Sequence, residues 1–199
     1  MATPTKTVAT SILTLQQIAS NSVLLSAVQS VTSKFAAQFG VHLGRDDTGG
    51  TLTAGVAFRI EGSMKSSGDD QWFPLAEYTS GTATPASEAV SGTEAAGATL
   101  IEVASTTGLE LGDIILFKNS TIANSEFSRI KALVANTSIT IIDGLTNAQT
   151  GSTIYDQGEF WTPVIDLLNM TRIRLVADAS NTGRSVVVEA YMNTCDSIG

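Results

Sequence analysis

The chain has 199 residues, of which 43% are hydrophobic, enough to bury one sizeable core or one core with a small satellite. Charged residues make up only 15%, and 19 acidic against 11 basic residues give a net charge of −8. Because nucleic-acid affinity depends mainly on Lys and Arg side chains that neutralise phosphates, this balance predicts no nucleic-acid partner.

Residues 1–32 are predicted to form an N-terminal arm followed by the first strand or strands. The residues up to Thr10 are polar and rich in threonine, which is typical of an arm that becomes ordered on contact with a partner. Leu24, Val28 and Val31 have the three-to-four spacing of a helix face. The density of Ser, Thr and Val and the lack of helix caps nevertheless favour strands, with a short helix as the alternative.

Three strands are predicted next. Alternating apolar and polar residues indicate a half-buried strand from Phe35 to Leu43, with the odd-numbered residues on the buried face. A second strand runs from Leu52 to Met64, with Val56, Phe58 and Ile60 inward. The third strand begins at Trp72. Their close spacing predicts an antiparallel meander.

Residues 81–156 differ in character from both flanks. Residues 81–97 are Ala, Thr, Ser, Glu, Gly and Pro with scarcely a large apolar side chain, so a linker is predicted there. Residues 98–156 contain five short predicted strands, at Thr99 to Val103, Asp113 to Lys118, Glu126 to Leu133, Ser138 to Ile142 and Thr153 to Tyr155. Because closure removes the edges of so small a sheet, we expect an inserted small β-barrel.

The C-terminal residues return to the earlier pattern. Strands are predicted at Phe160 to Leu168, Thr171 to Ala177 and Ser185 to Met192, with a hairpin turn at 181–183. The predicted fold class is all-β: an antiparallel β-sandwich, jelly-roll or immunoglobulin-like, with the barrel inserted into it. The sandwich would be discontinuous, over residues 33–80 and 157–199.

The only two tryptophans lie in matching tetrapeptides, in which Trp72 precedes Pro74 and Trp161 precedes Pro163. Paired tryptophans could form a platform for stacking sugars. The structural interpretation is favoured: Trp fills the core near a sandwich edge, and Pro, which lacks an amide donor, sits where a strand starts or is unpaired. The two would mark neighbouring strands that cross the sandwich where the barrel attaches.

The sequence predicts no catalytic, cofactor or metal site, and hence no enzyme. His42, the only histidine, lies on the polar face of a strand without a nucleophile to serve, so a surface or interface role is expected. The acidic pairs at 46–47 and 69–70 lie in turns and lack the alternating spacing of a calcium loop. The single Cys195 allows no intrachain disulfide.

No export or membrane segment is predicted. The N-terminal residues lack the basic region and apolar core that a signal peptide requires. Apolar runs such as 114–117 are far shorter than the ~20 residues that span a bilayer. We therefore expect a soluble protein with no membrane partner, made in a cytosol.

Several stretches carry a resemblance to a known family. In the predicted sandwich, these stretches are residues 33–45, 58–63, 68–75, 172–174 and 186–190. These resemble small virion structural proteins of tailed bacteriophages. The inserted unit, above all residues 112–115 and 126–130, is similar to a small β-barrel module of phage and surface proteins.

The resemblance implies a capsid decoration (cement) protein that stabilises the head by bridging capsomers. It would lie on the capsid exterior of the virion after synthesis in the host cytoplasm. Its partners would be the major capsid protein and copies of itself, in a homo-oligomer such as a trimer, and no cofactor is implied. The alternative is a carbohydrate- or receptor-binding accessory protein of the tail or head-tail region. The candidate structural or interface residues are Trp72, Pro74, Trp161, Pro163, Arg45, Arg59 and Arg172.

Overall fold

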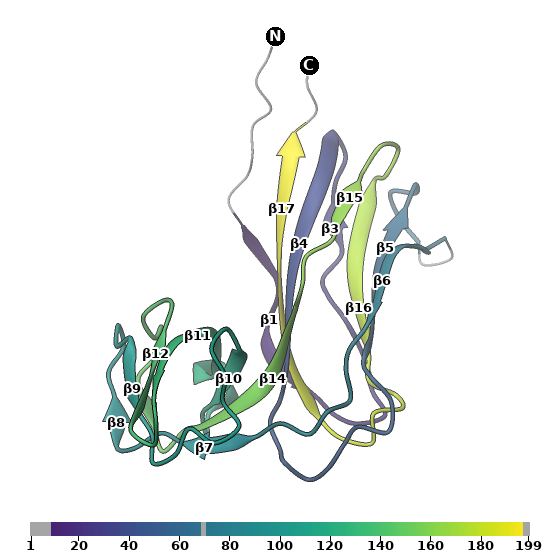
Figure 1. Cartoon of the computed structure of the whole chain (residues 1–199). Helices are drawn as coiled ribbons and strands as arrows, with labels where there is room; N and C mark the ends of the chain where they lie inside the picture. Colours follow the sequence, from purple (N-terminus) through teal and green to yellow (C-terminus); the bar gives the residue numbers. More distant parts are fainter. Residues whose placement is uncertain (1–8, 69–70, 197–199) are drawn as a thin grey trace.

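The protein is an all-β sandwich, which confirms the predicted fold class. The computed structural model describes residues 9–68 and 71–196. Within them, antiparallel strands form the molecule, and one short 3-10 turn lies at Ile122–Asn124. Figure 1 shows two layers of long upright strands, with a smaller group of short strands beside one end. The predicted arm falls mostly on residues 1–8, outside the described residues.

The large sheet forms one layer of the sandwich and continues into the smaller group. Its first part has the order β1 (Thr10–Ile18), β17 (Val186–Asp196), β4 (Lys34–Arg45) and β14 (Thr153–Trp161), and β15 (Val164–Asp166) also pairs with β4. Beyond β14 follow β10 (Ile114–Lys118), β11 (Glu126–Val134), β12 (Ser138–Ile141) and β9 (Leu100–Glu102).

The small sheet forms the other layer. Its order is β2 (Val23–Leu25), β16 (Arg172–Asp178), β5 (Ala57–Ser63) and β6 (Phe73–Thr79), with β3 (Gln29–Ser30) also paired to β16. The strands β1, β2 and β3 confirm the prediction that residues 10–32 favour strands over a helix.

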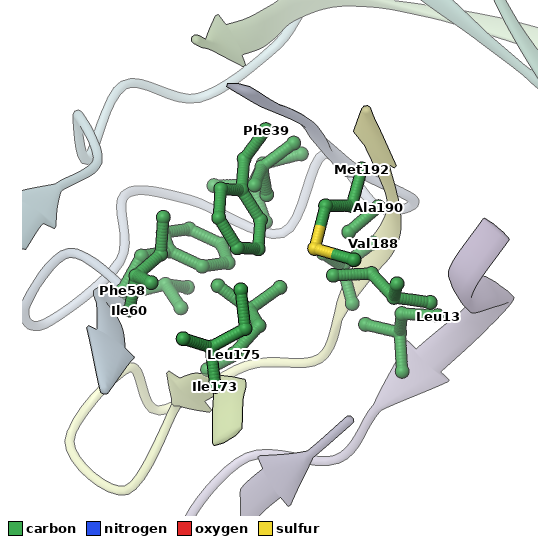
Figure 2. Packing of buried hydrophobic residues seen from close by; sticks show 14 of the residues in the cluster. Leu13, Phe39, Phe58, Ile60, Ile173, Leu175, Val188, Ala190 and Met192 are labelled. Atoms are coloured by element: carbon green, nitrogen blue, oxygen red, sulfur yellow. The ribbon is translucent and has the colours of Figure 1, made fainter. Parts of the chain in front are cut away.

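The sandwich core lies between the two layers and confirms the predicted alternation. Phe39 and Val41 of β4 and Phe58 and Ile60 of β5 are almost fully buried. Figure 2 shows Phe39 and Phe58 in the interior together with side chains of β16 and β17, such as Leu175 and Val188. Phe35, predicted on the same face, is an exception with 44% of its surface exposed. Burial of each large side chain contributes about 1.5–3 kcal/mol.

A second core lies within the smaller group of strands. It contains isoleucines from β9, β10, β11, β12 and β14 together with Phe117, all almost fully buried. An isolated bridge between Val90 and Val103 joins the segment after β7 (Ser87–Ala89) to the segment after β9, while β7 itself pairs with β14. The strands therefore lead from β14 through β10, β11, β12 and β9, and then through this bridge and β7 back to β14. This closed order supports the predicted inserted barrel. The barrel and its domain boundaries stay a proposal.

The predicted meander is wrong. β5 and β6 are hydrogen-bonded neighbours, but β4 pairs with β17, β14 and β15 in the other sheet. The connection between β4 and β5, residues 46–56, is long enough to carry the chain from one layer to the other, where a tight turn would have kept the two strands adjacent. Close spacing in sequence did not decide which strands pair.

The predicted hairpin at residues 181–183 is also wrong. β16 before it belongs to the small sheet and β17 after it to the large sheet, so this turn crosses between layers. The amide of Thr53 donates to the carbonyl of Thr182 (2.9 Å), which ties the crossing to the connection before β5. The glycine and polar residues here make a turn but not a two-stranded ribbon.

The segment predicted as a linker, residues 81–97, contains two short strands. β7 pairs with β14, and β8 (Thr93–Glu94) pairs with β13 (Gln149–Thr150). Backbone hydrogen bonds to neighbouring strands order this segment despite its small side chains. In the described part of the chain, no helix has the length and apolarity needed to cross a membrane.

Candidate interaction surfaces

Within residues 9–68 and 71–196, no group of three or more His, Cys, Asp or Glu side chains is placed to hold a metal ion. The acidic pair at 46–47 has protein partners. The carboxylate of Asp46 accepts hydrogen bonds from Lys118 Nζ (2.5 Å) and Ser185 Oγ (3.2 Å). The pair at 69–70 lies outside the described residues. Asp46 therefore links β10 of the smaller group to the end of β4.

Arg45 is a buried residue at the same junction. Its guanidinium donates to the carbonyl of Ala83 (3.0 Å) and to the carboxylate of Asp47 (2.9 Å). Arg184 also donates to Asp47, at 3.2 Å. Arg45 thus ties the end of β4 to the segment that leads into the smaller group of strands.

An arginine–tryptophan face covers the outside of the small sheet and consists of Arg59, Glu61, Trp72, Arg172 and Arg174. The guanidinium carbons of Arg172 and Arg174 lie 4.9 and 4.2 Å from the centroid of the Trp72 ring. Glu61 accepts from Arg174 at 2.8 Å and lies 3.5 Å from Arg59. The structure therefore brings together three of the predicted residues, Arg59, Trp72 and Arg172.

This face gathers basic side chains on an acidic protein, with Glu61 and Glu77 among them. With Lys65 on the adjacent loop, it holds four of the chain's 11 basic residues. Arg172 also donates to the carbonyls of Lys65 (2.8 Å) and Gly68 (2.7 Å), so its side chain is fixed above the sheet. Guanidinium groups stacked on an indole present a flat, preordered surface that suits carboxylates of a partner.

Trp161 is partly buried and packs against the sandwich core. Its ring is 5.7 Å from that of Tyr78 and 6.4 Å from that of Phe58. The Tyr78 hydroxyl donates to Glu159. Burial, and then this hydrogen bond and the charge of Glu159, raise the pKa of Tyr78 to about 12. Because Trp72 precedes β6 and Trp161 ends β14, the two do not mark neighbouring strands, and that prediction is wrong.

The two prolines lie at irregular points of the strand pairing. Pro74 lies on β6, at the edge of the small sheet, opposite Glu61 and beside a shift in register. Pro163 separates β14 from β15, both of which pair with β4, and its carbonyl accepts from the amide of Phe39 (3.0 Å). Neither position requires the amide donor that proline lacks.

An aromatic stack lies on the outer face of the large sheet and consists of Phe160, His42 and Phe127. The His42 ring is stacked 4.3 Å from Phe160 and 5.2 Å from Phe127. Two outward-facing glycines of β4 make room for it. A Cβ on Gly40 would lie 3.1 Å from the Phe160 ring, and one on Gly44 would lie 2.7 Å from the Phe127 ring.

A hydrogen-bonded chain fixes the orientation of His42. Its Nδ1 lies 2.9 Å from Oε1 of Glu189, whose other oxygen accepts from the Tyr191 hydroxyl (2.9 Å). Because a carboxylate only accepts, Nδ1 carries a proton. Burial, then the charge and the hydrogen bond of Glu189, raise the pKa of Tyr191 to about 12.

Three hollows lie along the outer face of the large sheet. One of about 370 Å³ lies between the aromatic stack and strands β10 to β12, and one of about 300 Å³ adjoins Phe160 and Tyr191. A third, of about 290 Å³ and mostly apolar, lies beside Val164 and Cys195. Val164 is 70% exposed and Phe160 44% exposed. Apolar groups gathered on one face in this way are typical of a binding surface.

Sequence reasoning did not identify Phe127, Phe160, Glu189 or Arg174 as members of a site. Most of their partners are far away in the sequence, so no local pattern joins them into a site. One local signal was present: Gly40 and Gly44 alternate with His42 on the outward face of a strand. Glycine inside a strand often marks the close approach of another group, which here is an aromatic ring.

No protein-family model matches the chain, and no curated protein is similar enough in sequence to count as a match. Among solved structures, VP17, a capsid protein of bacteriophage P23-77, is 10% identical with a TM-score of 0.23, over 99% of each chain. The VP16–VP17 complex of the two major capsid proteins of that phage gives 10% identity and a TM-score of 0.22, over 98% of this chain and 100% of that one.

A structure of infectious bursal disease virus, Gt strain, is 11% identical with a TM-score of 0.26. The match covers 97% of this chain but 40% of that one. TM-scores this low carry no argument about the fold or the function of this chain.

Proposed function

We propose that this chain is a structural protein of a phage virion that decorates the capsid exterior and stabilises the head by bridging capsomers. Its partners would be the major capsid protein and copies of itself, in a homo-oligomer such as a trimer. The outer face of the large sheet, with Val164, Phe160 and Tyr191 exposed beside shallow hollows, carries this proposal.

The composition of that face suits a protein contact. The centres of such interfaces are depleted in Lys and Glu and enriched in aromatic residues. The hollows beside β15 and β17 are lined by residues such as Gln38, Phe39, Asn193 and Val164, with no Lys or Glu among them. Short side chains on a flat sheet lose little rotamer entropy on binding. We assign the capsid contact to this face.

The arginine–tryptophan face supplies a second contact of different chemistry. A protein with a net charge of −8 repels its own copies unless opposite charges meet. Arg59, Arg172 and Arg174 on one face can pair with acidic groups elsewhere on a second copy or on the shell. Such complementarity fixes orientation and raises the association rate more than it raises affinity.

Rebinding to undecorated particles tests the proposal. We expect the purified chain to bind particles that lack it and to raise their melting temperature. Val164→Asp should weaken this binding at least about tenfold, because it places a charge in the apolar contact. Leu111→Asp is the matched control, since Leu111 is 69% exposed but lies in the smaller group of strands. Absence of the wild-type chain from the particle surface would refute the proposal.

A carbohydrate- or receptor-binding accessory protein is the second candidate. The mixed aromatic and polar lining of the hollow beside the aromatic stack favours it. Binding assays of the isolated protein with polysaccharides separate the two candidates. A receptor-binding protein should bind its ligand without the particle, whereas a decoration protein should bind only to the particle.

A further inference from the structure

The hollow of about 370 Å³ beside the aromatic stack, here called the junction cavity, has a lining suited to a small ligand. It lies where the outer face of the large sheet meets β10 to β12, and sites between two packed units are common places for ligands. Its lining includes His42, Phe127, Phe160, Glu126, Arg129 and Asp143.

One wall of the cavity is preformed. Glu126 holds the loop after β12, because its carboxylate accepts from the amides of Thr146 (2.7 Å) and Asn147 (3.1 Å). The same carboxylate accepts from Gln149 Nε2 (2.8 Å). The loop that carries Asp143 is thus fixed by hydrogen bonds before any ligand arrives, which reduces the entropy cost of binding.

Two polar side chains of the lining remain available to a ligand. Within the described part of the chain, the guanidinium of Arg129 and the carboxylate of Asp143 have no hydrogen bond or ion pair. Both residues are exposed, on β11 and on the loop after β12. One only donates and the other only accepts.

The charge of the lining excludes some classes of ligand. Two carboxylates, Glu126 and Asp143, stand against one guanidinium, Arg129, so the cavity is negative overall and disfavours phosphates. A purely apolar ligand would leave Arg129 and Asp143 without partners. The lining instead suits a neutral molecule with an apolar side and several groups that both donate and accept.

We propose that the junction cavity binds a neutral saccharide unit. The apolar C–H face of a pyranose packs against the exposed part of Phe160 and Phe127, and its hydroxyls donate to Asp143 and accept from Arg129. The proposal rests on the second candidate function, carbohydrate binding, and names its site and ligand class. It uses no residue of the hollow beside Val164, and it shares Phe160 with the face assigned to the capsid contact.

Saturation-transfer NMR on the full chain tests this, with D-glucose, D-galactose, N-acetyl-D-glucosamine and their β-linked disaccharides as probes. We expect at least one of them to bind with a dissociation constant on the order of 1 mM, as is usual for so small a contact. Backbone amide shifts on titration should map to residues 126–129, 142–146 and 160.

Two variant pairs separate the site from general surface effects. Phe160→Ala should weaken binding about fivefold through loss of stacking. Phe35→Ala, also 44% exposed and in the same sheet but outside the cavity, should leave it unchanged. Arg129→Ala should weaken binding by a similar factor, whereas Lys131→Ala on the same strand should not.

No transfer to any of these sugars at about 10 mM would overturn the proposal. So would binding that Phe35→Ala weakens as much as Phe160→Ala does. Failure to bind particles would overturn the decoration proposal and leave this one standing, so the two failures are distinguishable.

Discussion

Two glycines of β4 determine how closely aromatic rings approach the large sheet. Gly44 lies beneath Phe127 of β11, and Gly40 lies beneath Phe160. A Cβ at position 44 would meet Phe127 at 2.7 Å and the Leu116 Cβ at 3.2 Å, both on strands of the smaller group. The absence of a side chain at residue 44 lets Phe127 and Leu116 of the smaller group lie this close to the sandwich.

Gly44→Ala should therefore lower the free energy of unfolding by about 1–3 kcal/mol, since overpacking forces the facing strand to shift. Gly40→Ala is the control, because its new Cβ would meet only the rim of the half-exposed Phe160 ring, at 3.1 Å. Urea unfolding of both variants gives the comparison. Equal losses would show that Phe127 is free to move away.

Tyr78 makes stability depend on pH in the alkaline range. Its pKa is raised from 10.0 to about 12 in the folded chain, by burial and by Glu159. Above pH 10 the unfolded chain loses this proton while the folded chain keeps it, so unfolding is favoured as the pH rises. The contribution is fully present below pH 10 and is lost as the pH rises to about 12.

We expect the urea midpoint to fall between pH 9.5 and 11.5, which lie on either side of the Tyr78 pKa in the unfolded chain (~10). Tyr78→Phe should reduce that fall, because the variant has no hydroxyl to titrate. Part of the fall will remain, since the pKa of Tyr191 is also raised to about 12. An identical fall in Tyr78→Phe and wild type would contradict the assignment.

At the scale of elements, the contact between Lys118 and Asp46 joins β10 to the end of β4. The Asp46 side chain is almost fully buried, so removal of the ammonium leaves a buried carboxylate with weaker partners. Lys118→Met should cost about 1–3 kcal/mol of unfolding free energy. Lys131→Met, an exposed lysine on β11, should change it by less than about 0.5 kcal/mol. Thermal unfolding of both variants is the measurement.

Strands with a clear apolar pattern were predictable from the sequence. The predicted strand at Asp113 to Lys118 is β10 (Ile114–Lys118), and that at Ser138 to Ile142 is β12 (Ser138–Ile141). β7 and β8 were missed because they are strands of three and two residues with small and polar side chains. β7 is ordered by hydrogen bonds to β14, and β8 by hydrogen bonds to β13. These pairings leave no pattern in the local sequence.

Strand pairing was less predictable than strand position, and the candidate site least of all. The connections 46–56 and 179–185 both cross between layers, although the second resembles a hairpin turn in composition. The stack of His42 between Phe127 and Phe160 depends on three strands far apart in the chain. Such contacts follow from the tertiary arrangement and not from any single segment.

At the scale of the whole molecule, the two cores use different parts of the chain. The buried residues of the sandwich core lie at positions 12–60 and 165–192, and those of the second core at 90–154. Deletion of residues 81–156 with a short bridge should therefore leave a chain that still folds. Circular dichroism should show strands and a cooperative, weakened thermal transition. Loss of all folding would show that the two parts are one domain.

Strand β14 takes part in both regions without a break. Its first residues pair with β10 and β7, and Glu159 to Trp161 pair with β4 (Figure 1). A force applied to the smaller group would act on the sandwich through this strand. It would load the backbone hydrogen bonds between β14 and β4, because no flexible linker separates the two parts of the strand. Strand β14 therefore couples the two cores directly through backbone pairing.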